Sequence, residues 1–297
     1  MILLTGTSGF IGSVLLDKII AKFGGTNVLA LTSKPTNKCN YLLHNDYVFD
    51  SDFFIKSGYE NIDTIIHAGA FIPKSGDQAN NCYKCTSNIT NTFALLKVNI
   101  PNLKKIIFLS TIDVYSMHDG VLTEETPVIP VSLYGHSKVY CERMIVSWAS
   151  HNKILPQILR IGHVYGPGEE QYQKAIPVMI KKILNNESIQ IFGLGEEIRS
   201  FIYIADVINA IIKSIDLDFF DGPINVVSGN QINIKDLAQL LIKISESNTN
   251  VEFVETINTK QRDLVFDNSK MKKYLLHQEI DFVFGLKREY NYMKNLS

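Results

Sequence analysis

The chain opens with Met-Ile-Leu-Leu and continues directly into Thr5-Gly6-Thr7-Ser8-Gly9-Phe10-Ile11-Gly12. The opening residues are typical of a short buried strand, and the apolar residues that follow recur at helical spacing. Of the three glycines, the first permits a tight turn, the second lets a pyrophosphate approach the backbone, and the third lets the helix pack on the strand. The helix N-terminus would present unpaired N–H groups to phosphate. This stretch therefore predicts a doubly wound α/β fold that holds a dinucleotide, because an ordinary strand-to-helix turn explains one glycine but not three.

Length and composition exclude several classes of protein. The 297 residues are 45% hydrophobic and carry a formal net charge of −1, which indicates a sizeable core and argues against nucleic acid or a membrane surface as a partner. No apolar run approaches the about 18 residues that cross a bilayer, and the chain already begins in an expected strand, so we expect no signal peptide. Four cysteines form no disulfide framework, which favours a cytoplasmic protein. Cys82 and Cys85 have no second ligand pair, so we expect no metal.

The first half of the chain alternates strand and helix patterns. The expected strands are Ile2–Thr5, Asn27–Thr32, Tyr47–Phe49, Thr64–His67, Ile106–Ser110 and Ile154–Arg160, and the expected helices are Gly9–Phe23, Asn80–Val98 and Leu133–Ser150. After residue 168 the pattern changes to short strands at Ser188–Phe192, Ser200–Ile204 and Val251–Glu255, with helices near Lys174–Leu184, Ile234–Ser247 and Ser269–Leu275. We therefore expect a Rossmann-type parallel sheet in residues 1–168, with 205–228 returning to it. Residues 169–204 and 229–297 are expected to form a smaller mixed α/β lobe that binds the substrate.

A second pattern carries chemistry. Tyr134 and Lys138 are four residues apart and fall on one face of an expected helix. A nearby ammonium stabilises a phenolate and lowers its pKa, so that the tyrosine can act as a general acid or base. Such a pair is also common on ordinary exposed helices. The interpretation is strengthened by Thr111, which follows an expected central strand and offers a hydroxyl to the oxygen that gains or loses the proton.

Further segments occur in a fixed order along the chain. They are His67-Ala68-Gly69-Ala70, Asn88-Ile89-Thr90-Asn91-Thr92, the run from Leu159 to Gly168, the run from Phe192 to Val207 with Arg199, and Arg262-Asp263. Together with the glycine loop and the Thr111–Tyr134–Lys138 triad, they resemble the extended short-chain dehydrogenases/reductases, in the branch of nucleotide-sugar epimerases, dehydratases and reductases. Asn91 stands where that family has glycine, and His163 stands where it has asparagine.

The resemblance implies roles for individual residues. The catalytic residues would be Thr111, Tyr134 and Lys138. The NAD(P) cofactor would contact Gly6, Ser8, Gly9, Phe10, Ile11, Gly12, Ser33, Lys34, Asp50, His67, Ala68, Gly69, Ser110, Tyr134, Lys138, Ile161 and His163. The substrate would contact Thr111, Asp113, Tyr134, His163, Arg199 and Arg262, with Arg199 on the diphosphate. For His163, a donor role and a tolerated replacement of asparagine remain equally open. The resemblance also implies a homodimer that pairs the helices near Asn80–Val98 and Leu133–Ser150.

Residues at two places in the sequence, 33–34 and 112–113, narrow the choice of cofactor and of reaction. NAD enzymes of this kind usually carry a carboxylate at the end of the second strand, whereas this chain has Ser33 and Lys34, which suit the 2′-phosphate of NADP. The family's dehydratases carry an Asp-Glu pair after the catalytic threonine. Here Ile112 cannot transfer a proton and only Asp113 remains, so dehydration is disfavoured. The GDP-fucose-synthase type has a cysteine at the position of Asp113, so its epimerisation is disfavoured too.

Two reactions and one inactive alternative remain. The preferred hypothesis is an NADPH-dependent reductase of a nucleotide-linked 4-keto-6-deoxyhexose, in which Tyr134 protonates O4, Lys138 holds the nicotinamide ribose and Thr111 orients O4. By family analogy it would serve surface polysaccharide synthesis. The alternative is an NAD-dependent C4 epimerase of the UDP-hexose type. A catalytically silent dinucleotide-binding protein is the third, although such proteins typically lack the tyrosine or the lysine.

Overall fold

The computed structural model describes residues 1–115, 120–255 and 263–296. Its largest sheet has seven strands, β1 (Ile2–Thr5), β2 (Val28–Thr32), β3 (Asn40–Leu43), β4 (Thr64–His67), β5 (Lys105–Thr111), β7 (Leu155–Ile161) and β11 (Ile224–Val226). They lie in the order β11-β7-β5-β4-β1-β2-β3, and all neighbours are parallel. The order reverses between β1 and β4, which is where doubly wound sheets bind ligands. The expected Rossmann-type α/β fold is confirmed.

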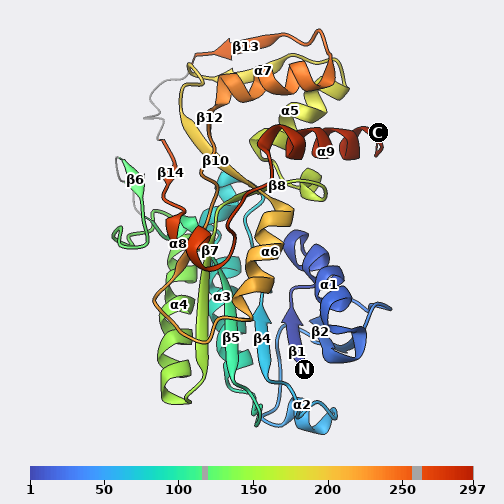
Figure 1. Ribbon diagram of the computed structural model, residues 1–297, viewed down its shortest axis with the longest axis vertical. Helices are drawn as coiled ribbons and strands as arrows, with labels where there is room; N and C mark the ends of the chain where they lie inside the picture. Colours follow the sequence, from blue (N-terminus) through green and yellow to red (C-terminus); the bar gives the residue numbers. More distant parts are fainter. Residues whose placement is uncertain (116–119, 256–262, 297) are drawn as a thin grey trace.

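Helices cover the sheet on both faces (Figure 1). They are α1 (Phe10–Phe23), α2 (Phe53–Lys56), α3 (Cys82–Leu96), α4 (Leu133–His151) and α6 (Ile204–Ser214). The packing pairs α3 with α4 and α1 with α6. Capping side chains fix where two of them begin, since Asn81 accepts from Lys84 N at 3.0 Å and Ser132 accepts from Gly135 N at 3.1 Å. Within the described residues, none of the helices combines the length and the apolar character that crossing a membrane demands.

The remaining elements form the upper part of the molecule in Figure 1, apart from the β6–β14 pair and α8, which lie beside the sheet. The helices are α5 (Ala175–Leu184), α7 (Ile234–Ser245), α8 (Ser269–Tyr274) and α9 (Phe282–Lys294), and the strands are β6 (Val121–Leu122), β8 (His163–Tyr165), β9 (Ile189–Phe192), β10 (Ile198–Tyr203), β12 (Gln231–Asn233), β13 (Val251–Val254) and β14 (Val265–Phe266). The small sheets are β12-β10-β8, β13-β9 and β14-β6. Ile224–Val227 returns to the main sheet as expected, through β11. The division into lobes stays a prediction.

One expected strand is wrong. Residues 47–49 do not form a strand, because Tyr47 has a φ of 56° and its ring packs against His44 at a centroid distance of 4.3 Å and against Phe49 at 5.7 Å. The apolar character of this segment serves an aromatic cluster at a left-handed turn. The third strand is β3 instead, an edge strand that pairs with β2 alone and is mostly exposed. The helices α6 and α9 are also absent from the sequence-based list.

Candidate active site

A cavity of about 770 Å³ runs along the carboxyl edge of the sheet, from the glycine loop to the triad. Strand register brings the parts together, since Thr5 pairs with His67 and Thr111 pairs with Ile161. Of the residues expected from the sequence, its lining includes Gly6, Ser8, Gly9, Phe10, Ile11, Gly12, Ser33, Ala68, Gly69, Ser110, Thr111, Asp113, Tyr134, Lys138, Ile161 and His163. Both ends of the predicted site therefore open into one continuous space.

The glycine loop has the shape that a pyrophosphate requires. A Cβ on Gly12 would lie 2.0 Å from the carbonyl oxygen of Gly6, so helix α1 approaches the loop as closely as its backbone allows. Gly6 has a φ of 74°, and a Cβ there would meet the backbone of Gly69 at 2.6 Å. Gly9 caps α1 without a side chain, which leaves N–H groups of the first turn available to an anion. The residues present fit a dinucleotide.

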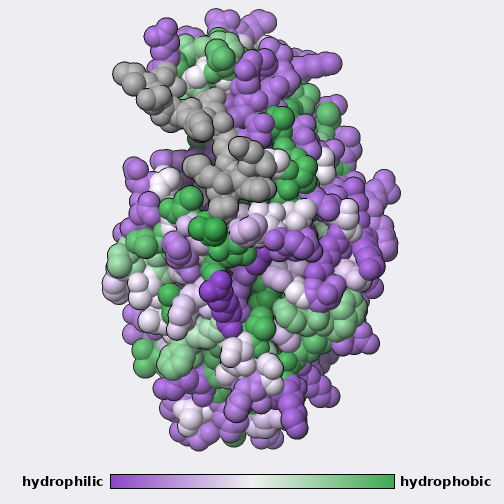
Figure 2. Space-filling view, turned by 90° about the vertical axis from the view of Figure 1, so that its left-hand side faces the viewer, coloured by the Kyte–Doolittle hydropathy of each residue, from purple (hydrophilic) through white to green (hydrophobic). Residues whose placement is uncertain are grey.

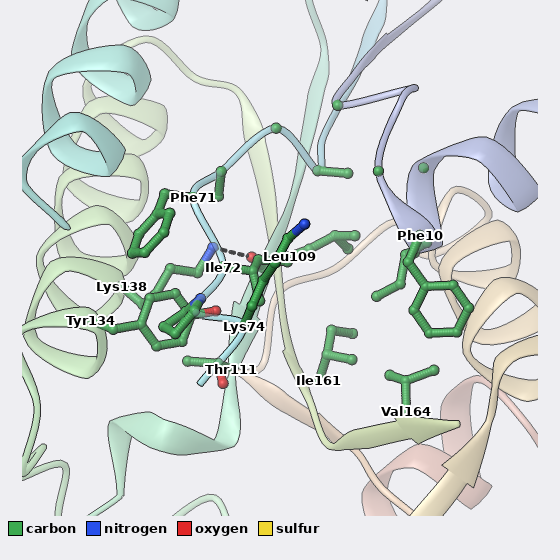
Figure 3. A pocket seen from close by; sticks show the side chains of 18 of the residues that line it. Phe10, Phe71, Ile72, Lys74, Leu109, Thr111, Tyr134, Lys138, Ile161 and Val164 are labelled. Atoms are coloured by element: carbon green, nitrogen blue, oxygen red, sulfur yellow. Dashed lines mark hydrogen bonds between the residues drawn. The ribbon is translucent and has the colours of Figure 1, made fainter. Parts of the chain in front are cut away.

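The triad lies at the other end of the cavity (Figure 3). Thr111 ends β5, while Tyr134 and Lys138 lie in the first two turns of α4. The Lys138 ammonium donates to the carbonyl oxygen of Leu109 at 2.5 Å and lies 4.3 Å from the Phe108 ring centroid. Both the tyrosine and the lysine are nearly fully buried. The backbone of β5 thus holds the Lys138 ammonium in the wall of the cavity, which Tyr134 also lines.

Burial controls the protonation of the triad. It raises the pKa of Tyr134 far above its usual value, the Asp113 charge adds to the rise, and a hydrogen bond with Thr111 opposes it. The expected lowering of the Tyr134 pKa is therefore wrong for this arrangement, because Lys138 is held by Leu109 and desolvation of the phenolate dominates. Burial also lowers the pKa of Lys138 to about 8, against the raising effects of Cys141 and Glu142. Tyr134 carries its proton at neutral pH.

A buried ion pair supports the triad from behind. Glu142, one turn after Lys138 on α4, accepts from Arg160 Nε at 3.1 Å and Nη2 at 2.9 Å, and from the Ser110 hydroxyl at 2.5 Å. Arg160 also donates to the Tyr115 hydroxyl at 2.9 Å. The sequence analysis missed this network. It joins α4 to β5 and β7, and thereby fixes the helix that carries the tyrosine and the lysine.

His67 and Asn88 act within the scaffold. The Thr5 hydroxyl accepts from Gly69 N at 2.8 Å and lies 2.8 Å from His67 Nδ1, while His67 Nε2 lies 3.0 Å from the Thr92 hydroxyl. Burial and the Lys138 charge lower the pKa of His67 to about 3, so the ring is neutral. Its side chain bonds the ends of β1 and β4 to α3 and does not line the cavity. The Asn88 side chain accepts from Phe71 N at 2.7 Å and donates to the carbonyl oxygen of Phe71 at 3.1 Å.

The ribose end of the cavity differs from expectation. Ser33 lines it, whereas Lys34 and Asp50 do not. Asp50 pairs with Lys56 at 3.1 Å on the surface. His44 and Tyr47 line the cavity in their place and were missed, since Tyr47 was expected to begin a strand and no element was expected at His44.

An outer cavity of about 300 Å³ adjoins the first and holds the expected diphosphate residue Arg199. His163 lines both cavities, and desolvation together with Lys174 and Arg199 lowers its pKa to about 4. Lys74 and Lys174 line both as well, and the sequence assigned no role to either. Arg262 lies outside the described residues. Across the described ranges, no cluster of His, Cys, Asp and Glu could hold a metal ion.

A doubly wound sheet, a glycine loop and a Thr–Tyr–Lys triad in one cavity define an extended short-chain dehydrogenase/reductase. Residues 2–227 match the model of the NAD dependent epimerase/dehydratase family, and the chain belongs to that family. A putative UDP-glucose 4-epimerase of Methanocaldococcus jannaschii is 29% identical over 311 residues, covering 99% of each chain. A dTDP-4-dehydro-6-deoxyglucose reductase of Escherichia coli is 28% identical over 279 residues, covering 90% of this chain and 88% of that one.

A solved structure agrees with this assignment. The UDP-glucuronic acid 4-epimerase of Bacillus cereus, in complex with UDP-glucuronic acid and NAD, superposes with a TM-score of 0.84 at 26% identity. The alignment covers 100% of this chain and 99% of that chain. Relatives thus include both epimerases and a reductase, and the family resemblance expected from the sequence is confirmed.

Proposed function

We propose that the protein is an NADPH-dependent reductase of a nucleotide-linked 4-keto-6-deoxyhexose, such as a dTDP-4-dehydro-6-deoxyglucose. One observation carries the proposal: among the described residues, Asp113 is the sole carboxyl side chain that lines the main cavity. It lies at the catalytic end, beside Thr111. The ribose end therefore offers no carboxylate to a 2′-hydroxyl, and the catalytic end lacks the pair of carboxylates that dehydration needs.

Each side chain of the triad has a separate role in the proposed reaction. A bound nicotinamide dinucleotide would supply the hydride that reduces C4. Tyr134 donates its proton to O4, and the raised pKa of its phenol keeps that proton in place until the oxygen gains negative charge. Thr111 orients O4 through its hydroxyl. Lys138 holds the nicotinamide ribose and places a positive charge beside the phenolate that is left.

Asp113 is assigned to the substrate. Its carboxylate lies 3.3 Å from the Thr111 hydroxyl, and desolvation in the cleft raises its pKa while Thr111 and Lys174 oppose the rise. It is positioned to accept a hydrogen bond from a sugar hydroxyl next to C4. Arg199 is assigned to the diphosphate, where a planar guanidinium suits paired phosphate oxygens.

A second candidate is C4 epimerisation with retained NAD. It is favoured by the similarity to UDP-hexose epimerases and by a relative that binds NAD. Epimerisation must begin with Tyr134 as a base, and burial, which raises the pKa of its phenol, opposes that first step. A silent dinucleotide-binding protein is disfavoured because the complete triad lines the cavity.

The test uses the purified enzyme, NADPH and dTDP-4-keto-6-deoxyglucose. We expect stoichiometric loss of the absorbance of the reduced nicotinamide and a sugar nucleotide reduced at C4. NADH in place of NADPH measures the cofactor preference. Conversion of UDP-glucose to UDP-galactose with no net change of the nicotinamide would establish the epimerase instead.

We also infer a homodimer. The outward sides of α3 and α4 carry the exposed apolar residues Tyr83, Phe93 and Tyr140, of which Tyr83 is 86% exposed. Apolar patches among polar residues are visible on the side of the molecule that carries α4 (Figure 2). Pairing two copies of this helix pair would bury them. Light scattering on Tyr140→Asp, which should be monomeric, tests the interface.

A further inference from the structure

A lysine at the start of α5 reaches both parts of the site. Lys174 lines the main cavity, which holds the triad, and the outer cavity, which holds Arg199. Arg199 lines the outer cavity and is not among the residues that line the main one. The lysine is therefore nearer to the catalytic end than the arginine is.

The ammonium of Lys174 is held by long contacts. It lies 3.4 Å from Glu169 Oε1, 3.5 Å from the carbonyl oxygen of Val164 and 5.1 Å from the Tyr172 ring centroid. Ammonium–carboxylate hydrogen bonds are commonly about 2.7–2.9 Å, so this pair is loose. The lysine side chain is 36% exposed, whereas Glu169 is 2% exposed. An anion that enters the cavity can therefore reach the ammonium.

A second carboxyl group lies behind the first. Glu289 of α9 is 1% exposed, and its carboxyl group lies close enough to that of Glu169 for the two to interact electrostatically. Neither carboxyl oxygen of Glu289 has a hydrogen-bond partner among the described residues. Burial raises the pKa of Glu169 to about 7, and Lys174 opposes the rise. Burial and the Glu169 charge also raise the pKa of Glu289, because two adjacent buried carboxyl groups do not readily both ionise beside one ammonium. Besides Lys174, the charged and titratable groups around the pair and its neighbours include Tyr165, Tyr172, Tyr203, Asp206, Asp281 and Arg288, and Lys174 itself also acts on Asp113 and His163.

We propose that Lys174 binds the sugar-linked phosphate of the nucleotide-sugar substrate, and that Glu169 and Glu289 position its ammonium until the substrate arrives. The inference rests on the proposed nucleotide-sugar function. Of the two phosphates, the one linked to the sugar lies closer to the reacting carbon, as Lys174 lies closer to the triad than Arg199 does. Lys174 then determines how deeply the sugar enters the main cavity.

Substrate binding should change the protonation of the buried carboxyl pair Glu169–Glu289. When the ammonium moves from Glu169 to the phosphate, the buried pair loses its cation and takes up a proton from water. The diphosphate of a nucleotide sugar is a diester and has no proton to gain near neutral pH. Loss of the cation raises the pKa of Glu169 above its value of about 7 in the free protein, so binding should tighten as pH falls toward about 7 and change little below it.

The experiment measures binding by calorimetry with UDP-glucose and dTDP-glucose as probes, in the presence of NADP⁺. Lys174→Met should lower the affinity for whichever probe the wild type binds by about 10- to 100-fold, the range expected for a hydrogen bond to a charged group. Lys182→Met is the matched control and should bind as the wild type does, because Lys182 lies on α5, pairs with the exposed Glu187 and lines neither cavity. Retained NADP⁺ binding shows that each variant is folded.

The outcomes separate this inference from the proposed function. Equal affinity of Lys174→Met and wild type overturns the role of Lys174 and leaves the function standing. If the wild type binds neither probe, the nucleotide-sugar function fails, and this inference fails with it. If Lys174→Met loses affinity for UDP-glucuronate but not for UDP-glucose, the lysine recognises a sugar carboxylate and the phosphate assignment is wrong.

A second variant tests the positioning residues. In the wild type, affinity for the same probe should rise as pH falls toward about 7, and in Glu169→Gln this dependence on pH should be lost. A merely structural glutamate would change the affinity without changing this slope. An unchanged slope in Glu169→Gln overturns the role of the carboxyl pair.

Discussion

The ion pair between Glu142 and Arg160 offers the sharpest test of how the site is held. Both side chains are nearly fully buried, at 7% and 5% exposure, and two nitrogen atoms of the arginine contact the two carboxylate oxygens. Removing one member leaves the other charge uncompensated in a buried site, which costs about 3–5 kcal/mol. That is a large share of the about 5–15 kcal/mol by which a folded protein is stable. Glu142→Leu and Arg160→Met should each cost this much.

The double variant should be less destabilised than either single one. Replacing both charges by apolar side chains of similar size removes the desolvation penalty along with the attraction. What remains is the loss of partners for the hydroxyls of Ser110 and Tyr115, each worth about 1 kcal/mol. Since Tyr115 still donates to Asn225 at 2.6 Å, the double variant should lose about 1–2 kcal/mol.

Urea unfolding followed by circular dichroism measures the four proteins of this cycle. Independent side chains would give a double variant whose loss equals the sum of the two single losses within about 0.5 kcal/mol. Additivity of that kind would refute the reasoning, because it would mean that the two charges do not compensate each other.

Three further predictions concern the site itself. Tyr134→Phe should lower kcat by about 10²- to 10⁴-fold with NADPH binding retained, and unchanged turnover at saturating substrate would remove the tyrosine from the mechanism. Gly12→Ala should abolish binding of the dinucleotide, measured by fluorescence of the reduced nicotinamide, because its Cβ would lie 2.0 Å from the Gly6 oxygen; normal affinity would contradict the close packing of the loop. The rate of reduction should decline as pH rises through about 8, since Lys138 then loses its proton and its positive charge beside Tyr134, and a pH profile flat to well above that value would argue against the role of the ammonium.

Local patterns in the sequence predicted the parts of the site that local geometry determines. The glycine loop, Thr111 at the end of β5, and the Tyr134–Lys138 spacing on α4 each depend on one strand or helix and its immediate turn. Those residues line one cavity because parallel strands end at the same edge. The third strand was misplaced because two short apolar runs lie close together in the sequence, residues 41–43 and 47–49. The first belongs to the exposed edge strand β3, whereas the second follows the left-handed turn at Tyr47 and forms no strand.

Contacts between distant segments could not be predicted in the same way. Glu142 and Arg160 are ordinary charged residues in the sequence, and only the packing of α4 on β7 makes them a buried pair. Helix α9 was missed because one of its buried positions is the carboxyl residue Glu289, which weakens the apolar periodicity. That same carboxyl residue has a partner from another segment, Glu169, which no pattern along the chain connects to it.

Electrostatic interactions between distant segments couple the substrate end of the site, at Lys174, to the proposed acid, Tyr134. The Lys174 ammonium lowers the pKa of Asp113, and the Asp113 charge raises the pKa of Tyr134. We therefore expect that a charge that moves at the start of α5 changes the pKa of the proposed acid Tyr134 through one intervening carboxylate, Asp113. The main sheet and helix α4 determine which reaction can occur, because together they hold the triad and the dinucleotide loop. The segment from Glu169 to Lys174 determines the charge near the substrate end of the site. Substitutions in this segment should therefore change both the substrate preference and the pKa of Tyr134.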